Sequence, residues 1–186
     1  MTQPSFDAAG ALEFDLARGS LTFDGKVAAL AVPTSALDAL FKRAPADIVE
    51  GFGKRLGSQA AECVRERVGE HKLSLSLDGV TEHLGGAFAL LGLGNLQMER
   101  WGKALVVNIS GIPLKSAHVA IVRSALESAL LHLFERTVKG VAVSQDESSV
   151  KLLVVAPDVA PKVEAWVQQG FSWGELLDKL HRGVSA

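Results

Sequence analysis

The chain has 186 residues, of which 48 % are hydrophobic and 22 % are charged, and its formal net charge is −2. This length fits one domain with a substantial core, and the charge pattern lacks the clustered Lys and Arg that a nucleic-acid surface needs. The single cysteine, Cys63, excludes an intrachain disulfide and a multi-cysteine zinc site. The first residues lack the basic and apolar regions of a secretory signal, and no uncharged apolar run reaches the roughly 18 residues of a membrane helix. We therefore expect a cytoplasmic protein without a membrane span.

The first 45 residues predict short strands followed by a short helix. Apolar residues alternate with others around Leu12 and Leu21, and the strong turn dipeptide Asp24-Gly25 precedes the apolar run Val27–Val32. A helix is expected to begin at Ser35 and to end before Pro45.

The segment from Asp47 to Gly69 predicts a helix with glycines on one face. Asp47 and Glu50 resemble a capping box, and Cys63 lies on the apolar face as a small buried hydrophobe. A glycine inside a helix costs about 0.5–1 kcal/mol relative to alanine, so a stripe of small residues four apart needs a reason. The stripe predicts either close packing against another backbone or a wall of a ligand cavity. The residues assigned to this stripe or cavity are Phe52, Gly53, Leu56, Gly57, Ala61 and Phe88.

Further along, alternation in residues 72–77 favours a strand or an extended connection, and a helix ends in the Gly-Leu-Gly of residues 92–94. Two hairpins are predicted, one from Leu96–Trp101 with Ala104–Ile109 and one from Val141–Val143 with Val150–Val155. Between them, the helix Ser116–Thr137 is apolar on most faces, which is typical of a central helix or a subunit interface. The small residues that we assign to an interface are Ala117, Ala120, Ser124 and Ser128.

Two helices are predicted beyond Pro157, at Lys162–Gln169 and Trp173–His181, and Ser172 with Glu175 forms a capping box for the second. The aromatic residues Trp166, Phe171 and Trp173 either plug the core or form a docking surface. Because strands pair mainly with sequence neighbours, the fold class is α+β, with an antiparallel sheet of short hairpins covered by helices in a single domain, 1–186.

The order of elements resembles the 4-vinyl reductase domain, which shares its fold with the TRAPP vesicle-tethering subunits and, more distantly, with haem-based nitric-oxide sensors. The matching segments are FGKRLGSQAAECV, LLGLGNLQMERWGKALVVNIS, and the long helix that leads into KGVAVSQ and SVKLLVV. The resemblance covers about residues 12–155 and leaves 158–186 as a C-terminal helical addition. It implies a homodimer or heterodimer built on helices, and an internal apolar cavity that in some members holds an aromatic ligand or an acyl chain.

Many members of the 4-vinyl reductase family bind zinc through cysteines around the last hairpin. This chain has Ser144, Gln145, Asp146 and Glu147 there, so we expect no structural metal and no cofactor. In the haem-based relatives a histidine faces the cavity, and His118 and His132 would be the first candidates for that role here. The alternative is that both are solvated or satisfied in the core.

No nucleophile–base pair, GxSxG motif or P-loop is recognisable, so we expect no enzymatic activity. The prediction is a non-catalytic dimeric interaction module that scaffolds a protein partner. The alternative is a sensor domain that binds a small hydrophobic ligand in an internal cavity. A closed cavity beside the glycine stripe would favour the sensor, and a space filled by side chains would favour the scaffold.

Overall fold

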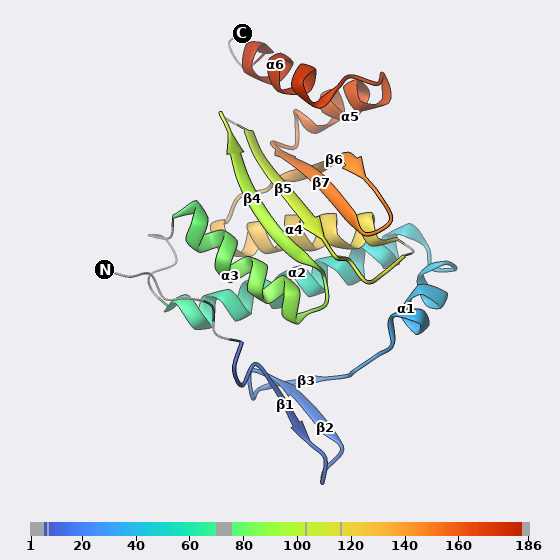
Figure 1. Cartoon of the computed structure of the whole chain (residues 1–186), viewed down its shortest axis with the longest axis vertical. Coiled ribbons are helices and arrows are strands. Elements are labelled where there is room, and N and C mark those ends of the chain that lie inside the picture. The colour runs from blue at the N-terminus through green and yellow to red at the C-terminus, as the bar shows by residue number, and fades with distance from the viewer. Residues whose placement is uncertain (1–5, 7, 70–75, 103, 116, 184–186) are drawn as a thin grey trace.

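The centre of the molecule is a four-stranded antiparallel sheet, seen in the computed structural model, which describes residues 6, 8–69, 76–102, 104–115 and 117–183. The strand order is β4-β5-β7-β6. The strands are β4 (Asn95–Trp101), β5 (Ala104–Ser110), β6 (Lys139–Gln145) and β7 (Ser149–Val155). Both predicted hairpins are therefore confirmed, and their strands pair with each other and through β5 and β7 (Figure 1).

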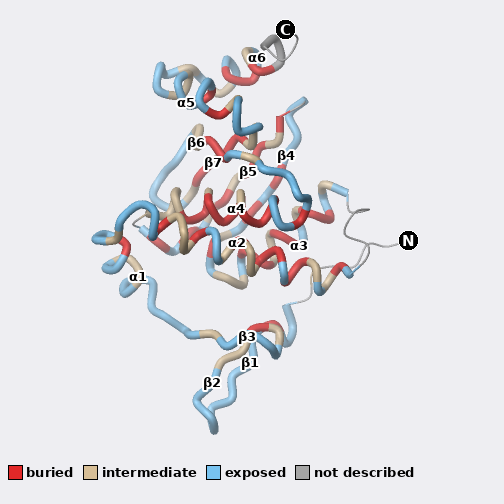
Figure 2. The backbone as a smooth tube through the Cα atoms, turned by 180° about the vertical axis from the view of Figure 1, so that it is seen from behind, coloured by how far each residue is buried: buried red, intermediate tan, exposed pale blue. Residues whose placement is uncertain are grey.

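Three helices form the main core with one face of this sheet: two of them lie against the strands, and the third packs under those two (Figure 1). They are α2 (Ala46–Val68), α3 (Leu77–Leu90) and α4 (His118–Phe134). Figure 2 shows that the buried backbone is concentrated in these helices and in the sheet. The main core includes Phe88 and Leu84 from α3, and Leu126 from α4, each at most 1 % exposed. Together these layers confirm the α+β fold class.

The opposite face of the sheet carries the last two helices, α5 (Ala160–Gln168) and α6 (Trp173–Gly183). They form a second, smaller hydrophobic cluster with inward side chains of the strands. Alternate residues of one strand therefore serve different cores, since Leu152 of β7 lies in the main core and Leu153 in the smaller one.

The N-terminal part forms a separate three-stranded antiparallel sheet, which we call the arm: β1 (Leu12–Asp15), β2 (Ser20–Phe23) and β3 (Val27–Ala29). Asp24 and Gly25 both have positive φ, as their turn dipeptide predicts. The short helix α1 (Thr34–Phe41) then leads back to α2. The arm projects from the body (Figure 1), and most of its backbone is exposed (Figure 2).

Some predicted boundaries were wrong. Pro45 is the residue before α2 and Asp47 lies within its first turn, so Asp47 and Glu50 do not form a capping box. The helix α4 ends at Phe134, because Glu135 takes a left-handed conformation there. Leu77, expected to end an extended segment, opens α3 after the cap residue Ser76. Most of that segment, residues 72–75, and the expected cap Ser116 lie outside the described residues.

The capping box of the last helix is confirmed, since the Glu175 carboxylate accepts hydrogen bonds from the Ser172 amide at 2.7 Å and from its hydroxyl at 2.6 Å. These bonds lower the pKa of Glu175, the hydroxyl of Ser172 contributing most. Among the described helices, none has the length and apolar character needed to cross a membrane.

Candidate functional site

The glycine stripe lies at the crossing of α2 with α4. A Cβ atom on Gly53 would stand 2.1 Å from the Ser124 hydroxyl oxygen, and one on Gly57 would stand 2.1 Å from the Ala125 carbonyl oxygen. Neither glycine can therefore carry a side chain without moving the other helix. The structure corrects the cavity interpretation of these two residues, because the backbone of α4 fills the space beside them.

The remaining residues of that predicted set belong to the main core. Ala61 and Phe88 are fully buried, while Phe52 and Leu56 are half-buried and pack against the same core. The rings of Phe52 and Phe41 lie 5.0 Å apart between centroids, and this pair joins α1 to α2. The residues of this predicted set therefore lie together and serve core packing.

The stripe assigned to a subunit interface faces the same crossing. Ser128 donates from its hydroxyl to the Lys54 carbonyl of α2 at 2.9 Å, and Ser124 donates to the Ala120 carbonyl within α4 at 2.7 Å. Both serines are buried, so they contact α2 of their own chain and are closed to a second subunit. Ala117 and Ala120 are half-buried at the start of the helix and pack against the main core. The apolar character of α4 is accounted for within one chain.

The C-terminal aromatic residues cover the smaller core. Trp166 and Trp173 pack against it, and the Trp173 ring meets Trp101 of β4 edge-on with 6.0 Å between centroids. The Lys179 ammonium lies 4.2 Å from the centre of the Phe171 ring. All three aromatic residues are half-buried. Of the two interpretations, the structure therefore favours the plug over the docking surface.

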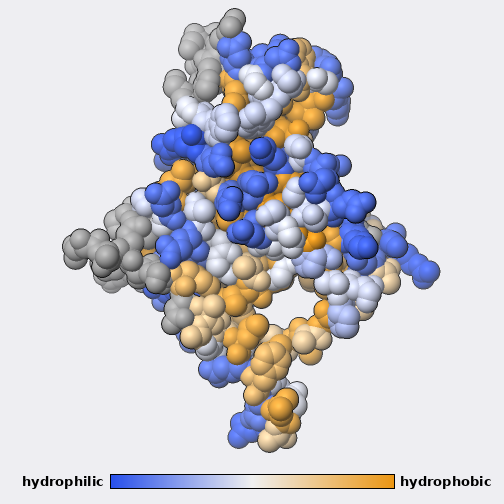
Figure 3. All heavy atoms as spheres, in the orientation of Figure 1, coloured by the Kyte–Doolittle hydropathy of each residue, from blue (hydrophilic) through white to orange (hydrophobic). Residues whose placement is uncertain are grey.

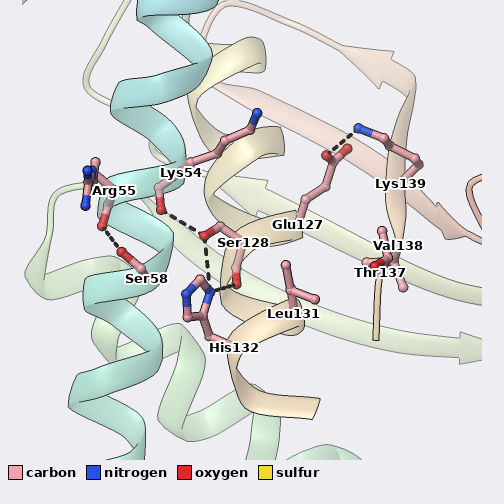
Figure 4. A pocket seen from close by; sticks show the side chains of 10 residues that line it. All are labelled: Lys54, Arg55, Ser58, Glu127, Ser128, Leu131, His132, Thr137, Val138 and Lys139. Atoms are coloured by element: carbon pink, nitrogen blue, oxygen red, sulfur yellow. Dashed lines mark hydrogen bonds and ion pairs between the residues drawn. The ribbon is translucent and has the colours of Figure 1, made fainter. Parts of the chain in front are cut away.

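A surface groove of about 400 Å³ lies between α2, α4 and the start of β6 (Figure 4). Its polar groups largely bind one another, since Glu127 accepts hydrogen bonds from Lys139 Nζ and the Gly140 amide, both at 3.0 Å. The Nδ1 atom of His132 donates to the Ser128 carbonyl at 2.8 Å. The polar groups of this open groove are therefore largely engaged with one another.

The two histidines considered for haem line open surface grooves and not an internal cavity. His132 is exposed and bonded as above, and His118 meets the Lys115 carbonyl through Nδ1 at 3.2 Å. Among the described residues, no three His, Cys, Asp or Glu side chains gather closely enough to hold a metal ion. The expectation that the protein holds no metal or cofactor stays a prediction.

Sequence reasoning missed His83, which lies on α3 and is only 1 % exposed. Neither of its ring nitrogens has a hydrogen-bond partner among the described residues. Buried polar side chains are nearly always hydrogen-bonded, and leaving one without a partner costs about 1–3 kcal/mol. The spacing of Val80, His83, Leu84 and Ala87 along the buried face of α3 is the sequence signal that could have found it.

His83 differs from the other side chains that contain a buried atom without a partner. In Arg65, His118 and Trp173 only one such atom is buried and unbonded. Arg65 donates elsewhere to the His132 carbonyl, and His118 is bonded through its other nitrogen. Trp173 has a single polar atom, the indole nitrogen, which also lacks a partner, but the Trp173 side chain is only half-buried. Among the described residues, His83 is the almost fully enclosed side chain in which two polar atoms lack a partner.

The ring of Phe6 lies beside His83, with 6.2 Å between ring centroids and an edge-on angle of 70°. Phe6 is half-buried and packs against the main core. Its ring also lies below the guanidinium of Arg67 on α2, 4.6 Å from the Cζ atom. Apolar core residues with one unsatisfied imidazole and a guanidinium over the neighbouring ring suit a small ligand with an aromatic ring and a single polar substituent.

Comparison with known proteins supports the fold. No protein-family model matches the chain, and no curated protein matches it in sequence. A solved structure that resembles it is the crystal structure of the phenol-responsive sensory domain of the transcription activator PoxR with phenol. The two chains share 14 % sequence identity with a TM-score of 0.64, over 79 % of this chain and 86 % of that one. This chain therefore has the same overall fold as that sensory domain.

Proposed function

We propose that the protein is a sensor domain that binds a small aromatic molecule with a hydrogen-bonding substituent, such as a phenol, against His83. The observation that carries the proposal is the enclosed imidazole, whose two nitrogens have no partner among the described residues. A ligand hydroxyl next to His83 would satisfy one nitrogen and recover the free energy that an unpaired buried group costs.

The fold likeness supports this class of ligand. The neighbouring structure is described as phenol-responsive and holds phenol. Phenol combines one apolar ring with one hydroxyl, and the surroundings of His83 combine apolar core with one polar side chain. Chemical complementarity and shared fold thus point to the same kind of molecule.

The scaffold that we first predicted has no feature of its own in the described structure. The small-residue stripes of α2 and α4 pack against each other, and the C-terminal aromatic residues cover the smaller core. The filled space beside the glycine stripe does not favour the sensor, so our preference for the sensor rests on the enclosed His83 and on the fold likeness. The 4-vinyl reductase resemblance, a dimeric state, a protein partner that receives the signal, a cytoplasmic location and the absence of catalysis remain parts of the proposal.

Phenol titration of the purified full chain by isothermal calorimetry tests the proposal. We expect one phenol per chain, and at least a tenfold loss of affinity in His83→Phe, which keeps an aromatic ring in the core but removes both nitrogens. The variant His132→Ala is the matched control, because that histidine is exposed, and it should bind as the wild type does.

Toluene serves as the ligand control, since it has the shape of phenol without the hydroxyl. Wild type should prefer phenol, and His83→Phe should lose that preference. Thermal melts establish that each variant is folded. Equal phenol affinity of the folded His83→Phe variant, or no phenol binding to any folded protein, would rule out this function.

A further inference from the structure

The ring of Phe6 occupies a slot that is shaped for a single aromatic ring. On one side the ring lies against α3 at Gly86, where an added Cβ would stand 2.3 Å from Phe6 Cδ1. Any residue larger than glycine at this position would therefore overlap the ring. Gly86 is an interior helix position, at which glycine lowers helix stability relative to alanine.

A second side of the slot is a cation. The Arg67 guanidinium lies over the face of the Phe6 ring, in the position of a cation–π contact. Arg67 is held there by the Asp24 carboxylate, 2.5 Å from its Nη2 atom, and by a bond from its Nε to the Cys63 sulfur at 3.3 Å. The guanidinium is thus fixed in place whether or not a ring lies beneath it.

The third side is His83, which approaches edge-on. The centroids of the Phe6 and His83 rings are 6.2 Å apart. A hydroxyl on a ring in the slot would extend across this distance toward the imidazole. Phe6 has no such group, and this explains why the slot is full while His83 remains unsatisfied. Phe6 fills the slot with an aromatic ring but carries no group that could hydrogen-bond to His83.

We propose that Phe6 is an internal substitute for the ligand, and that an aromatic ligand binds by displacing it from the slot between Gly86, Arg67 and His83. This inference rests on the proposed sensor function and adds how the site is kept closed and what ligand it selects. A cation over the ring face favours electron-rich rings, and His83 favours a hydroxyl, so phenols meet both requirements.

Displacement would also reach the arm. The Phe6 amide donates to the Glu82 carboxylate at 3.0 Å, and this backbone bond ties Phe6 to α3. At the base of the arm, Asp24 pairs with Arg67, the residue above the slot, and the Asp24 amide donates to the Ala11 carbonyl at 2.9 Å. The Arg67 guanidinium therefore contacts both the ring in the slot and Asp24 at the base of the arm.

The variant Phe6→Ala tests the inference in the full chain. Emptying the slot should tighten phenol binding at least tenfold, because the ligand no longer competes with the chain's own ring. Phe14→Ala removes an aromatic ring that is 63 % exposed on the arm and should leave the affinity unchanged. Cyclohexanol, which keeps the hydroxyl but lacks a π face, should bind neither protein tightly.

Gly86→Ala closes the slot from the side of α3. It should abolish phenol binding both alone and combined with Phe6→Ala, while the melting temperature shows a folded protein. Gly51→Ala is its control, since a Cβ at that helix position meets nothing within 4 Å. A fluorine label on the ring of residue 6, introduced as 4-fluorophenylalanine, reports displacement directly as a shift of its resonance on phenol addition.

The outcomes separate the two proposals. If wild type binds phenol through His83 but Phe6→Ala leaves the affinity unchanged and the fluorine resonance does not move, the substitute role of Phe6 is wrong and the sensor function stands. If neither wild type nor Phe6→Ala binds phenol, the sensor function itself is wrong. Tighter binding by Phe6→Ala with loss in Gly86→Ala supports both.

Discussion

At the residue scale, burial controls the chemistry of the lone cysteine. Cys63 is 1 % exposed, and desolvation raises the pKa of its thiol to about 11, which outweighs the hydrogen bond from Arg67. The thiolate is the reactive form, so an enclosed, protonated thiol is inert. The sequence-based expectation that Cys63 acts as a small buried hydrophobe is confirmed.

We predict that Cys63 in the native protein does not react with a disulfide reagent such as DTNB at pH 8. Labelling should follow global unfolding, with the same dependence on denaturant as the circular dichroism signal. The raised pKa also predicts that the thiol's contribution to stability is complete below pH 9 and is lost as the pH rises toward 11. Rapid stoichiometric labelling in native buffer would show an accessible thiol.

His83 and Phe6 also mark the limit of what the sequence can reveal at this scale. Periodicity on α3 indicates that position 83 faces inward, but a buried histidine with bonded nitrogens would give the same pattern. The approach of Phe6 to Gly86 joins segments 80 residues apart, and no local rule predicts such a contact. Gly86 itself looked like one more helix glycine.

At the element scale, the crossing of α2 and α4 depends on two glycines. We predict that Gly57→Ala destabilises the protein by about 1–3 kcal/mol, because its Cβ would overlap the Ala125 carbonyl. For a chain of this size the melting temperature should fall by roughly 2–4 °C per kcal/mol lost. Gly51→Ala, in the same helix but facing open space, should melt at the wild-type temperature or above it. Matching melts for the two variants would contradict the close approach.

The last two helices should be part of the folded body. We predict that a chain truncated after Pro157 exposes the inner face of the small core, including Val106, Val141 and Leu153, and associates or melts without cooperativity. Val163→Asp should imitate the truncation, because it buries an unpaired charge at a fully enclosed position. Lys162→Asp, exposed one residue earlier, should behave as wild type. A truncated chain that is monomeric and melts cooperatively would revive the docking interpretation.

Elements were predictable where local chemistry dominates. The β4–β5 hairpin follows from alternating apolar residues and a turn that contains Gly102. The β6–β7 hairpin follows from two apolar runs around the polar turn of residues 145–149, and the start of α6 follows from Ser172 and Glu175. The end of α4 was not predictable, since Glu135 gives no signal for the left-handed conformation that it adopts. The partner of each small-residue stripe could not be predicted either, because a stripe indicates close packing but does not identify the element that packs against it.

At the scale of the whole molecule, the arm is the element whose apolar side chains stay exposed in a single chain. Phe14, Leu16 and Leu30 are 63 %, 89 % and 87 % exposed, and an isolated three-stranded sheet of this size has little core of its own. Apolar side chains are also visible toward the arm in Figure 3. The base of the arm is held to α2 by ion pairs of Asp24 with Arg67 and of Lys26 with Glu66.

We predict that the protein is a dimer in solution and that the arm contributes to the contact. Light scattering at tens of micromolar should give twice the mass of one chain. Leu16→Ser should weaken the dimer, because the substitution removes apolar surface that a second chain would bury. Arg18→Ser, which alters an exposed polar residue of the same arm, should not. A monomer mass for the wild-type protein would contradict the prediction.

The four-stranded sheet is a single layer, and successive residues of a strand face the main core and the smaller core in turn. Leu152 and Leu153 are neighbours in β7, yet one packs under α2, α3 and α4 and the other under α5 and α6. A strand that rotates or shifts to accommodate a change on one face must therefore reposition side chains on the other. A structural change near α3 would in this way be transmitted through the sheet to α5 and α6 without a hinge.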